Sequence, residues 1–144
     1  MAALQAGVSR CRVLLAEAGP RCGGWLNSVD DTKIDNQPAQ VWIKKTLARL
    51  QAMDNVSVLK RTTLFGYGDH NYLTLAQNVT DHLKDKPAHL PRMRMWKVRA
   101  QQVILATGAI ERPLVFSGND LPGVMLASAA PVSYTHLTLP TNHP

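Results

Sequence analysis

The chain has 144 residues, of which 45% are hydrophobic and 18% charged, with a formal net charge of +6; these proportions exclude a chain that is disordered throughout. No apolar run reaches the roughly 18 residues that a membrane span requires, and the first residues lack the basic start and apolar block of a signal peptide. We therefore expect a cytoplasmic protein, or a mitochondrial matrix protein if the source is eukaryotic, with no membrane partner.

The first segments predict the beginning of an α/β fold. Residues 1–7 are typical of the last turns of a helix, since they are rich in alanine and end at Gly7, which can adopt a left-handed cap. The apolar run at residues 13–16 indicates a parallel strand buried on both faces. Glu17 follows this run directly. We therefore expect an acid at the carboxyl end of a strand.

A helix is predicted over residues 38–53, because a proline occupies its first position and Ile43, Leu47 and Leu50 form an apolar face. A Gly/Pro-rich loop at residues 19–24 precedes it. Apolar and β-rich composition predicts further strands at residues 56–59, 62–67, 72–79, 94–100 and 103–106. Helix, strand, helix and a group of antiparallel strands together indicate the α/β class.

Much of the positive charge is concentrated in one short stretch, residues 84–99. It lies on Lys84, Lys86, Arg92, Arg94, Lys97 and Arg99. These residues alternate in part with Met93, Met95 and Val98, as on a half-exposed strand. We interpret them as a solvated strand face and expect no nucleic-acid partner, because no nucleic-acid motif accompanies the charge. A basic module that binds RNA or another polyanion is the alternative from another functional class.

The end of the chain is expected to differ in origin from the rest. Residues 132–141 have the sequence that results from translating GTC TCT TAT ACA CAT CTG ACG CTG CCG ACG, which resembles a transposase adaptor used in preparing sequencing libraries. A natural Thr/Pro-rich tail does not predict this order of residues. We therefore expect one partial domain over residues 1–130 and an adaptor-derived tail over residues 131–144.

Two features indicate dinucleotide binding. In a Rossmann-type unit, an acid at the end of the second strand accepts hydrogen bonds from the ribose hydroxyls, and Glu17 is such an acid. Residues 103–109 resemble the A-T-G segment of two-dinucleotide-domain flavoproteins, and Gly23 and Gly24 lie upstream. The glycine turn that should precede Glu17 is absent. The pattern therefore predicts an incomplete Rossmann-type FAD/NAD(P)-binding domain with an antiparallel strand excursion.

Neither metal nor acid–base chemistry is indicated. Cys11 and Cys22 form no C-x-x-C pair. The Asp-His pairs at residues 69–70 and 81–82 lack the spacing of convergent metal ligands. We expect no metal site and assign no catalytic residue.

Several longer stretches of the sequence indicate a more specific family. They lie at residues 62–71, 79–83, 96–100, 109–116 and 122–127. In them the chain resembles the α subunit of heterotetrameric sarcosine oxidase, and the similarity covers most of residues 1–129. The selective motifs are F-G-Y-G-D-H-N and A-I-E-R-P-L-V-F, whereas A-T-G is shared with many flavoproteins. The resemblance implies a fragment of such a subunit, truncated at both ends.

The resemblance implies an oxidoreductase that acts on the CH–NH bond of sarcosine and, as an intact complex, demethylates it to glycine. That complex uses FMN, FAD and tetrahydrofolate and joins the α subunit to β, γ and δ subunits. This domain would hold a non-covalent NAD, with FAD as the alternative, and the fragment alone is expected to be inactive. Carried over by position, the cofactor-binding residues are Glu17, Ala18, Gly23, Gly24, Trp25, Leu64, Ala106, Thr107 and Gly108.

Their implied roles differ. Glu17 and Ala18 would face the adenosine ribose, Gly24 and Trp25 would follow the phosphates, and Leu64 would contact the adenine. Trp25 places a bulky ring where a smaller residue is expected. The related A chain of an opine oxidase or amino-acid dehydrogenase remains the alternative among oxidoreductases. It shares the A-T-G and paired-glycine elements but should not share F-G-Y-G-D-H-N.

Overall fold

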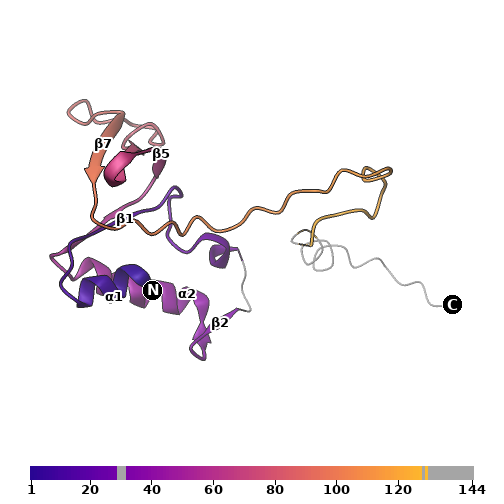
Figure 1. Cartoon of the computed structure of the whole chain (residues 1–144), viewed down its shortest axis with the longest axis horizontal. Coiled ribbons are helices and arrows are strands. Elements are labelled where there is room, and N and C mark those ends of the chain that lie inside the picture. Colours follow the sequence, from indigo (N-terminus) through magenta and orange to yellow (C-terminus); the bar gives the residue numbers. More distant parts are fainter. Residues whose placement is uncertain (29–31, 128, 130–144) are drawn as a thin grey trace. The chain divides into compact units, whose positions relative to one another are not determined.

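A computed structural model of the chain describes residues 1–28, 32–127 and 129 (Figure 1). The tail predicted at residues 131–144 lies outside these described residues. The chain divides into two compact units, Met1–Leu105 and Ala106–Pro144. The first unit has a mixed α/β architecture with small sheets, which confirms the predicted class at that level.

A parallel pair of strands, β1 (Val13–Ala16) and β4 (Val56–Leu59), forms one small sheet. Every residue of β1 pairs with the residue 43 positions later in the sequence. Two helices contact this pair and lie side by side, α1 (Ala2–Val8) against β1 and α2 (Ala39–Gln51) against β4 (Figure 1). The predicted strands and helices are thus confirmed here.

The burial expected for β1 is wrong. Val13 and Leu15 are half-buried, whereas Leu14 and Ala16 are exposed. Side chains of a strand alternate between its two faces, so one face of β1 is partly covered and the other is open in the described residues.

Gly7 lies inside α1, so the left-handed cap expected at this residue is also wrong. The left-handed residue of this region is Arg10, with φ of 60°. Gly7 is buried, and a Cβ atom there would come within 2.8 Å of Met53 Sδ and Val56 Cγ2. The side-chain amide of Asn55 donates to the carbonyls of Gly7 and Cys11, at 2.9 and 2.7 Å, which ties the end of α1 to the start of β4. Close packing, and not a turn, requires glycine at residue 7.

The α2 helix begins after Pro38, its N-cap, close to the predicted start. Ile43 and Leu50 are buried and Leu47 is half-buried, which confirms the predicted apolar face. A hairpin that the sequence patterns do not predict precedes the helix and joins β2 (Lys33–Ile34) to β3 (Gln37–Pro38). Asp35 and Asn36 make its turn with φ of 50° and 59°, a conformation that favours Asn, Asp and Gly.

An antiparallel sheet in the order β5-β6-β7 follows the parallel pair. Its strands are β5 (Thr62–Gly68), β6 (Tyr72–Asn78) and β7 (Met93–Arg99), and the 3-10 turn η2 (Asp69–Asn71) joins the first two. The buried residues on one face of this sheet are Thr62, Leu73 and Leu75. The pairing of β5 with β6 shifts register between Leu64 and Gly66, so this strand carries a bulge.

The alternation expected for β7 is only partly confirmed. Trp96 and Val98 are half-buried, but Met93 and Met95 are exposed. Because side chains change face at each residue, the methionines share a face with Lys97 and Arg99, and Arg94 lies on the other face with Trp96. The positive charge of the strand is therefore divided between its two faces.

The strand predicted at residues 103–106 is wrong. These residues have no regular secondary structure, and Ile104 and Leu105 are 68% and 64% exposed. A strand forms only where a neighbour completes its hydrogen bonds, and the described residues supply none at this place. In the described part of the second unit, a turn at residues 117–120 is closed by hydrogen bonds from Asn119 N to Phe116 O and from Leu121 N to Gly118 O.

Within the described ranges, no helix has the length and apolar character needed to cross a membrane.

Candidate functional site

Glu17 lies at the carboxyl ends of both parallel strands. Its backbone N–H donates to Leu59 O at 2.8 Å, which continues the pairing of β1 with β4 by one residue. Its carbonyl accepts from Thr62 N at 2.9 Å, which ties it to the first residue of β5. The backbone of Glu17 is therefore fixed from two sides at the edge where three strands meet.

The carboxylate of Glu17 is oriented by the loop that follows. Gly19 N donates to Glu17 Oε1 at 2.8 Å, and the residue is half-buried. This bond engages one carboxylate oxygen and holds the side chain near its own backbone. The second oxygen is the one left to accept hydrogen bonds from a bound group.

The glycine-rich loop folds back toward this acid. Partial burial raises the pKa of the Cys22 thiol, the negative charge of Glu17 raises it further, and Lys60 opposes the shift. Gly23 has φ of 126°, and a Cβ atom there would come within 2.8 Å of Ile43 Cδ1. The loop is thus packed against α2 at Gly23 and lies within electrostatic range of Glu17 at Cys22.

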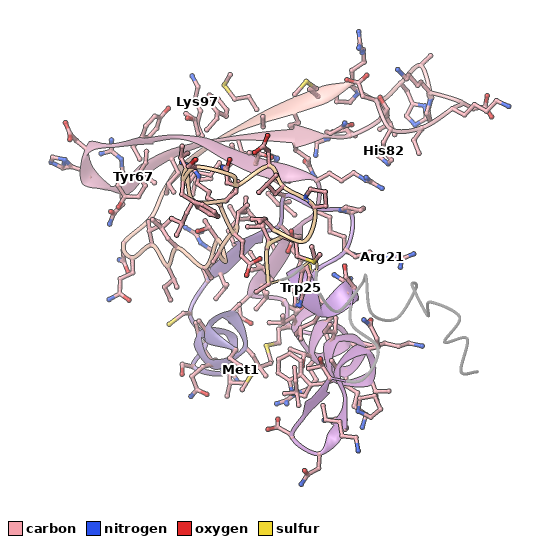
Figure 2. All side chains as sticks on the ribbon, turned by 90° about the vertical axis from the view of Figure 1, so that its right-hand side faces the viewer. Met1, Arg21, Trp25, Tyr67, His82 and Lys97 are labelled. Atoms are coloured by element: carbon pink, nitrogen blue, oxygen red, sulfur yellow. The ribbon has the colours of Figure 1, made fainter. Side chains whose placement is uncertain are left out.

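Gly24 differs from Gly23 in its surroundings. Its φ is 52°, and no described heavy atom lies within 4 Å of the position that a Cβ atom would take. It begins the 3-10 helix η1 (Gly24–Asn27), which Gln40 holds through a 2.6 Å bond from Nε2 to Leu26 O. Trp25 lies on η1 (Figure 2) and is 61% exposed. The backbone at Gly24 can therefore be approached closely from outside.

Leu64 and Ala18 lie on different sides of β5. Leu64 is half-buried, pairs with Leu75 and comes directly before the bulge. Ala18 lines an open cavity of about 290 Å³ beside the antiparallel sheet. The other lining residues are Arg61, Thr63, Ala76, Asn78 and Met93.

Ala106, Thr107 and Gly108 belong to the second unit and are exposed. Gly108 has φ of 73°, so glycine is suited to this position. The first unit brings Glu17, Ala18 and the paired glycines together in one loop region. That residues 106–108 bind the same cofactor as this loop region remains a prediction.

The two Asp-His pairs have separate structural surroundings. Asp81 accepts from Arg92 Nε at 2.7 Å and from Lys86 Nζ at 3.3 Å, and these hydrogen bonds hold its pKa below its usual value. His70 lies in η2 with φ of 58°. Figure 2 shows Tyr67 and His82 at opposite ends of the sheet. In the ranges that the structure describes, no group of His, Cys, Asp and Glu could hold a metal ion.

Arg61 is the residue of this region that sequence reasoning missed. It has φ of 53°, donates from its backbone N–H to Gly19 O at 3.0 Å, and accepts at its carbonyl from Asn78 N at 2.9 Å. Arginine is not a residue type that favours positive φ, so no sequence signal marks this position. Tertiary hydrogen bonds impose the conformation.

No family model matches the chain. It is 46% identical over 128 residues to the sarcosine oxidase α subunit of Rhizobium meliloti, and 47% identical over 130 residues to that of Corynebacterium sp. strain P-1. Each match covers 89% of this chain. The A chain of the opine oxidase of Agrobacterium tumefaciens is 30% identical over 137 residues, which are 92% of this chain and 26% of that protein.

The chain spans about 13% of the length of these two sarcosine oxidase proteins. Their high identity over most of the chain confirms the resemblance that the motifs at residues 62–71 and 109–116 indicate. The chain therefore corresponds to a segment of a sarcosine oxidase α subunit. The alternative, an A chain of an opine oxidase, fits less well, because the identity to that protein is lower.

Proposed function

Because the chain corresponds to a segment of a sarcosine oxidase α subunit, we propose that it is part of the NAD-binding domain of such a subunit. The domain is of the Rossmann type, incomplete in this segment, and Glu17 is its ribose-binding acid. In the intact complex, with β, γ and δ subunits, FMN, FAD and tetrahydrofolate, sarcosine is oxidatively demethylated to glycine. The segment contributes nucleotide binding and no catalytic residue.

The observation that carries this proposal is the position of Glu17. Ligands of open α/β sheets bind outside the carboxyl ends of parallel strands, and Glu17 follows β1 where β1 pairs in parallel with β4. A carboxylate there accepts from the 2′- and 3′-hydroxyls of a ribose and repels a 2′-phosphate. NAD is therefore favoured over NADP. The acid would serve the ribose of FAD equally well, and the relation to the α subunit favours NAD.

The glycine loop supports the same proposal. Gly24 combines a positive φ with open space at its Cα, so a phosphate group can approach the backbone without meeting a side chain. Ala18 is small and exposed, which leaves room beside the acid. Thr107 and Gly108 supply the equivalent small residues of the A-T-G segment in the second unit.

Two other functions are less well supported. The opine oxidase protein shares 30% identity with the chain, and measured oxidation of opines but not sarcosine by the intact complex would favour it. A polyanion-binding module requires a continuous basic surface. On β7, however, Arg94 lies on one face and Lys97 and Arg99 on the other.

The proposal is tested on the full-length protein, purified with its partners, by extracting and identifying its non-covalent nucleotide. NAD is expected in the wild type, and Glu17→Ala should weaken NAD binding by roughly 1–3 kcal/mol because a charge-assisted hydrogen bond is lost. Glu17→Gln keeps an oxygen for Gly19 N and removes only the charge. Asp54→Ala, at an exposed acid of the turn before β4, is the matched control.

Two results contradict the proposal. One is FAD, in place of NAD, bound at this domain. The other is unchanged NAD affinity in both Glu17 variants.

A further inference from the structure

We propose that the outer face of the antiparallel sheet is a docking surface for an acidic amphipathic helix, and that this helix belongs to a part of the same α subunit outside these residues. The outer face consists of three rows of residues paired across the strands, namely Gly68, Tyr72 and Arg99; Gly66, Thr74 and Lys97; Thr63, Ala76 and Met95. It contains none of the residues proposed to bind the nucleotide.

The two faces of this sheet differ in how far the described residues cover them. Leu73 and Leu75 are buried and lie on the inner face, since side chains change face at each residue of a strand. On the outer face, Met95 is 61% exposed, and Lys97 and Arg99 are exposed as well. Figure 2 shows Lys97 extending outward from the sheet. In the described part of the chain, the outer face is therefore open.

Gly68 is a glycine that the described fold does not require. Its φ is −115°, which any residue adopts. A Cβ atom there would lie 3.7 Å from Tyr72 O and 3.9 Å from Tyr72 Cδ1, which are ordinary contacts. A glycine inside a strand weakens the strand and often marks the close approach of another element. Gly68 therefore leaves space above β5 for something that lies outside the described residues.

The charge of the outer face selects an acidic occupant. None of the residues in its three rows is an aspartate or glutamate. The ion pairs of the described residues join Asp81 to Lys86 and Arg92, so Lys97 and Arg99 have no acidic partner there. The guanidinium of Arg99 lies 5.8 Å from the centroid of the Tyr72 ring, which restricts its side chain before any carboxylate arrives.

The spacing along β7 suits a helix. Met95, Lys97 and Arg99 are alternate residues of one strand, so neighbours among them are about 6.6 Å apart. Residues i and i+4 of a helix are separated by about 6 Å along its axis. A helix lying along β7 can thus place an apolar side chain over Met95 and carboxylates over Lys97 and Arg99. Methionine adapts its shape to such an apolar side chain.

Three other occupants fit the outer face less well. Anionic membranes attract clusters of roughly four to eight cations, whereas this face carries Lys97 and Arg99 alone. A second copy of the chain would bring the same two positive charges against each other. A separate subunit needs a larger area, because each side of a standard interface contributes roughly 20–30 residues.

A segment of the same subunit needs less area, because its tether gives it a high effective concentration. The chain spans about 13% of the length of the sarcosine oxidase α subunits that it matches. Most of such a subunit therefore lies outside these residues and can supply the helix.

Cross-linking of the full-length α subunit, purified with its partners, identifies the occupant. A water-soluble carbodiimide joins the amine of Lys97 directly to a carboxylate that contacts it. Peptide mass spectrometry should find Lys97 linked to an aspartate or glutamate of the α subunit outside residues 1–129. Links from Lys97 to another subunit or to a second α subunit would overturn the proposal.

Acetylation by acetic anhydride measures how fully the surface is covered in the same complex. If the docked state is populated about 90% of the time, Lys97 should react about tenfold more slowly than Lys84, an exposed lysine of the loop between β6 and β7. Gly68→Gln fills the space above β5, and Arg99→Glu repels the acidic helix. Both variants should raise the Lys97 rate to that of Lys84.

Arg94→Glu is the matched control, because it makes the same change of charge on the other face of β7 and should leave Lys97 protected. Hydrogen exchange of the β5 amides should be unchanged or slower in Gly68→Gln, which separates loss of docking from loss of folding. Equal rates at Lys97 and Lys84 in the wild type would overturn the proposal. So would protection that survives both outer-face variants, or that requires added phosphatidylserine vesicles.

Discussion

The hydroxyl of Thr74 occupies the place where a side chain of Gly66 would begin. The two residues are paired across β5 and β6, and Thr74 Oγ1 donates to Gly66 O at 3.4 Å. A Cβ atom at Gly66 would collide with Thr74 Oγ1. Gly66 is therefore required by its neighbour and not by its φ angle. The bulge between Leu64 and Gly66 lies directly beside this contact.

Gly66→Ala should destabilise the antiparallel sheet by about 1–3 kcal/mol, because strand or side chain must move to admit the methyl group. Thr74→Ala removes the obstructing hydroxyl. The double variant should therefore lose less stability than the sum of the single changes. Hydrogen exchange of the β5 and β6 peptides in the full-length protein measures the local opening free energy. Additive losses would show that the two residues are not coupled.

Gly7→Ala should destabilise the contact of α1 with the parallel strands, since its methyl group would lie 2.8 Å from Met53 Sδ and Val56 Cγ2. Overpacking of this kind costs about 1–3 kcal/mol, which outweighs the gain in helix propensity. Gln5→Ala, at an exposed position of the same helix, is the control and should be neutral or slightly stabilising. Faster exchange of α1 amides in Gly7→Ala alone is expected. Equal exchange in both variants would argue against close packing at Gly7.

The loop between β6 and β7 should loosen in acid. Its Asp81 has a pKa held below the usual value, first by the hydrogen bond from Arg92 and also by Lys86. A lowered folded-state pKa means that the stabilisation is present above the unfolded value of about 3.9 and is lost as pH falls through the folded value. Proteolysis by an acid-active protease at residues 82–91 should therefore increase over that interval. Asp81→Asn should abolish this pH dependence and Asp85→Asn should retain it.

The alkylation rate of the Cys22 thiol should depend on the charge of Glu17. Burial raises the pKa of this thiol and Glu17 raises it further, so less of it is thiolate at neutral pH. Glu17→Gln should accelerate alkylation of Cys22 by iodoacetamide, and Lys60→Gln should slow it. The rate at Cys11, which is exposed, is the internal control. Identical Cys22 rates in wild type and Glu17→Gln would mean that the loop does not bring the thiol near the acid.

The elements best predicted from the sequence are those that local composition determines. Residues 13–16 and 56–59 are short apolar strands, and the period of Ile43, Leu47 and Leu50 fits a helix whatever the strands do. The strand expected at residues 103–106 has the same composition but no neighbour in the described residues. Local composition predicts that a segment can form a strand, but it does not predict which neighbouring strand will complete its hydrogen bonds.

Residues fixed by tertiary contacts are the ones that sequence patterns do not predict. Local sequence preferences predict a helix cap at Gly7, but glycine is required there because Met53 and Val56 pack against it. For Arg61, two hydrogen bonds to distant segments impose positive φ, and no residue preference indicates it. The acid Glu17 is identifiable because its position follows directly from the strand before it. The open cavity that Ala18 lines cannot be identified from the sequence, because its lining comes from four separate segments.

The constant offset of 43 positions between β1 and β4 has a kinetic consequence. Closing so long a loop costs entropy before any native contact is gained, whereas β5 and β6 meet through a turn at residues 69–71. Pairings between neighbours in the chain form earlier than distant ones. The antiparallel strands should therefore assemble while the parallel pair is still open. On a ribosome, the acid end of β1 would reach its final geometry only after residues 56–59 have emerged and α2 has formed.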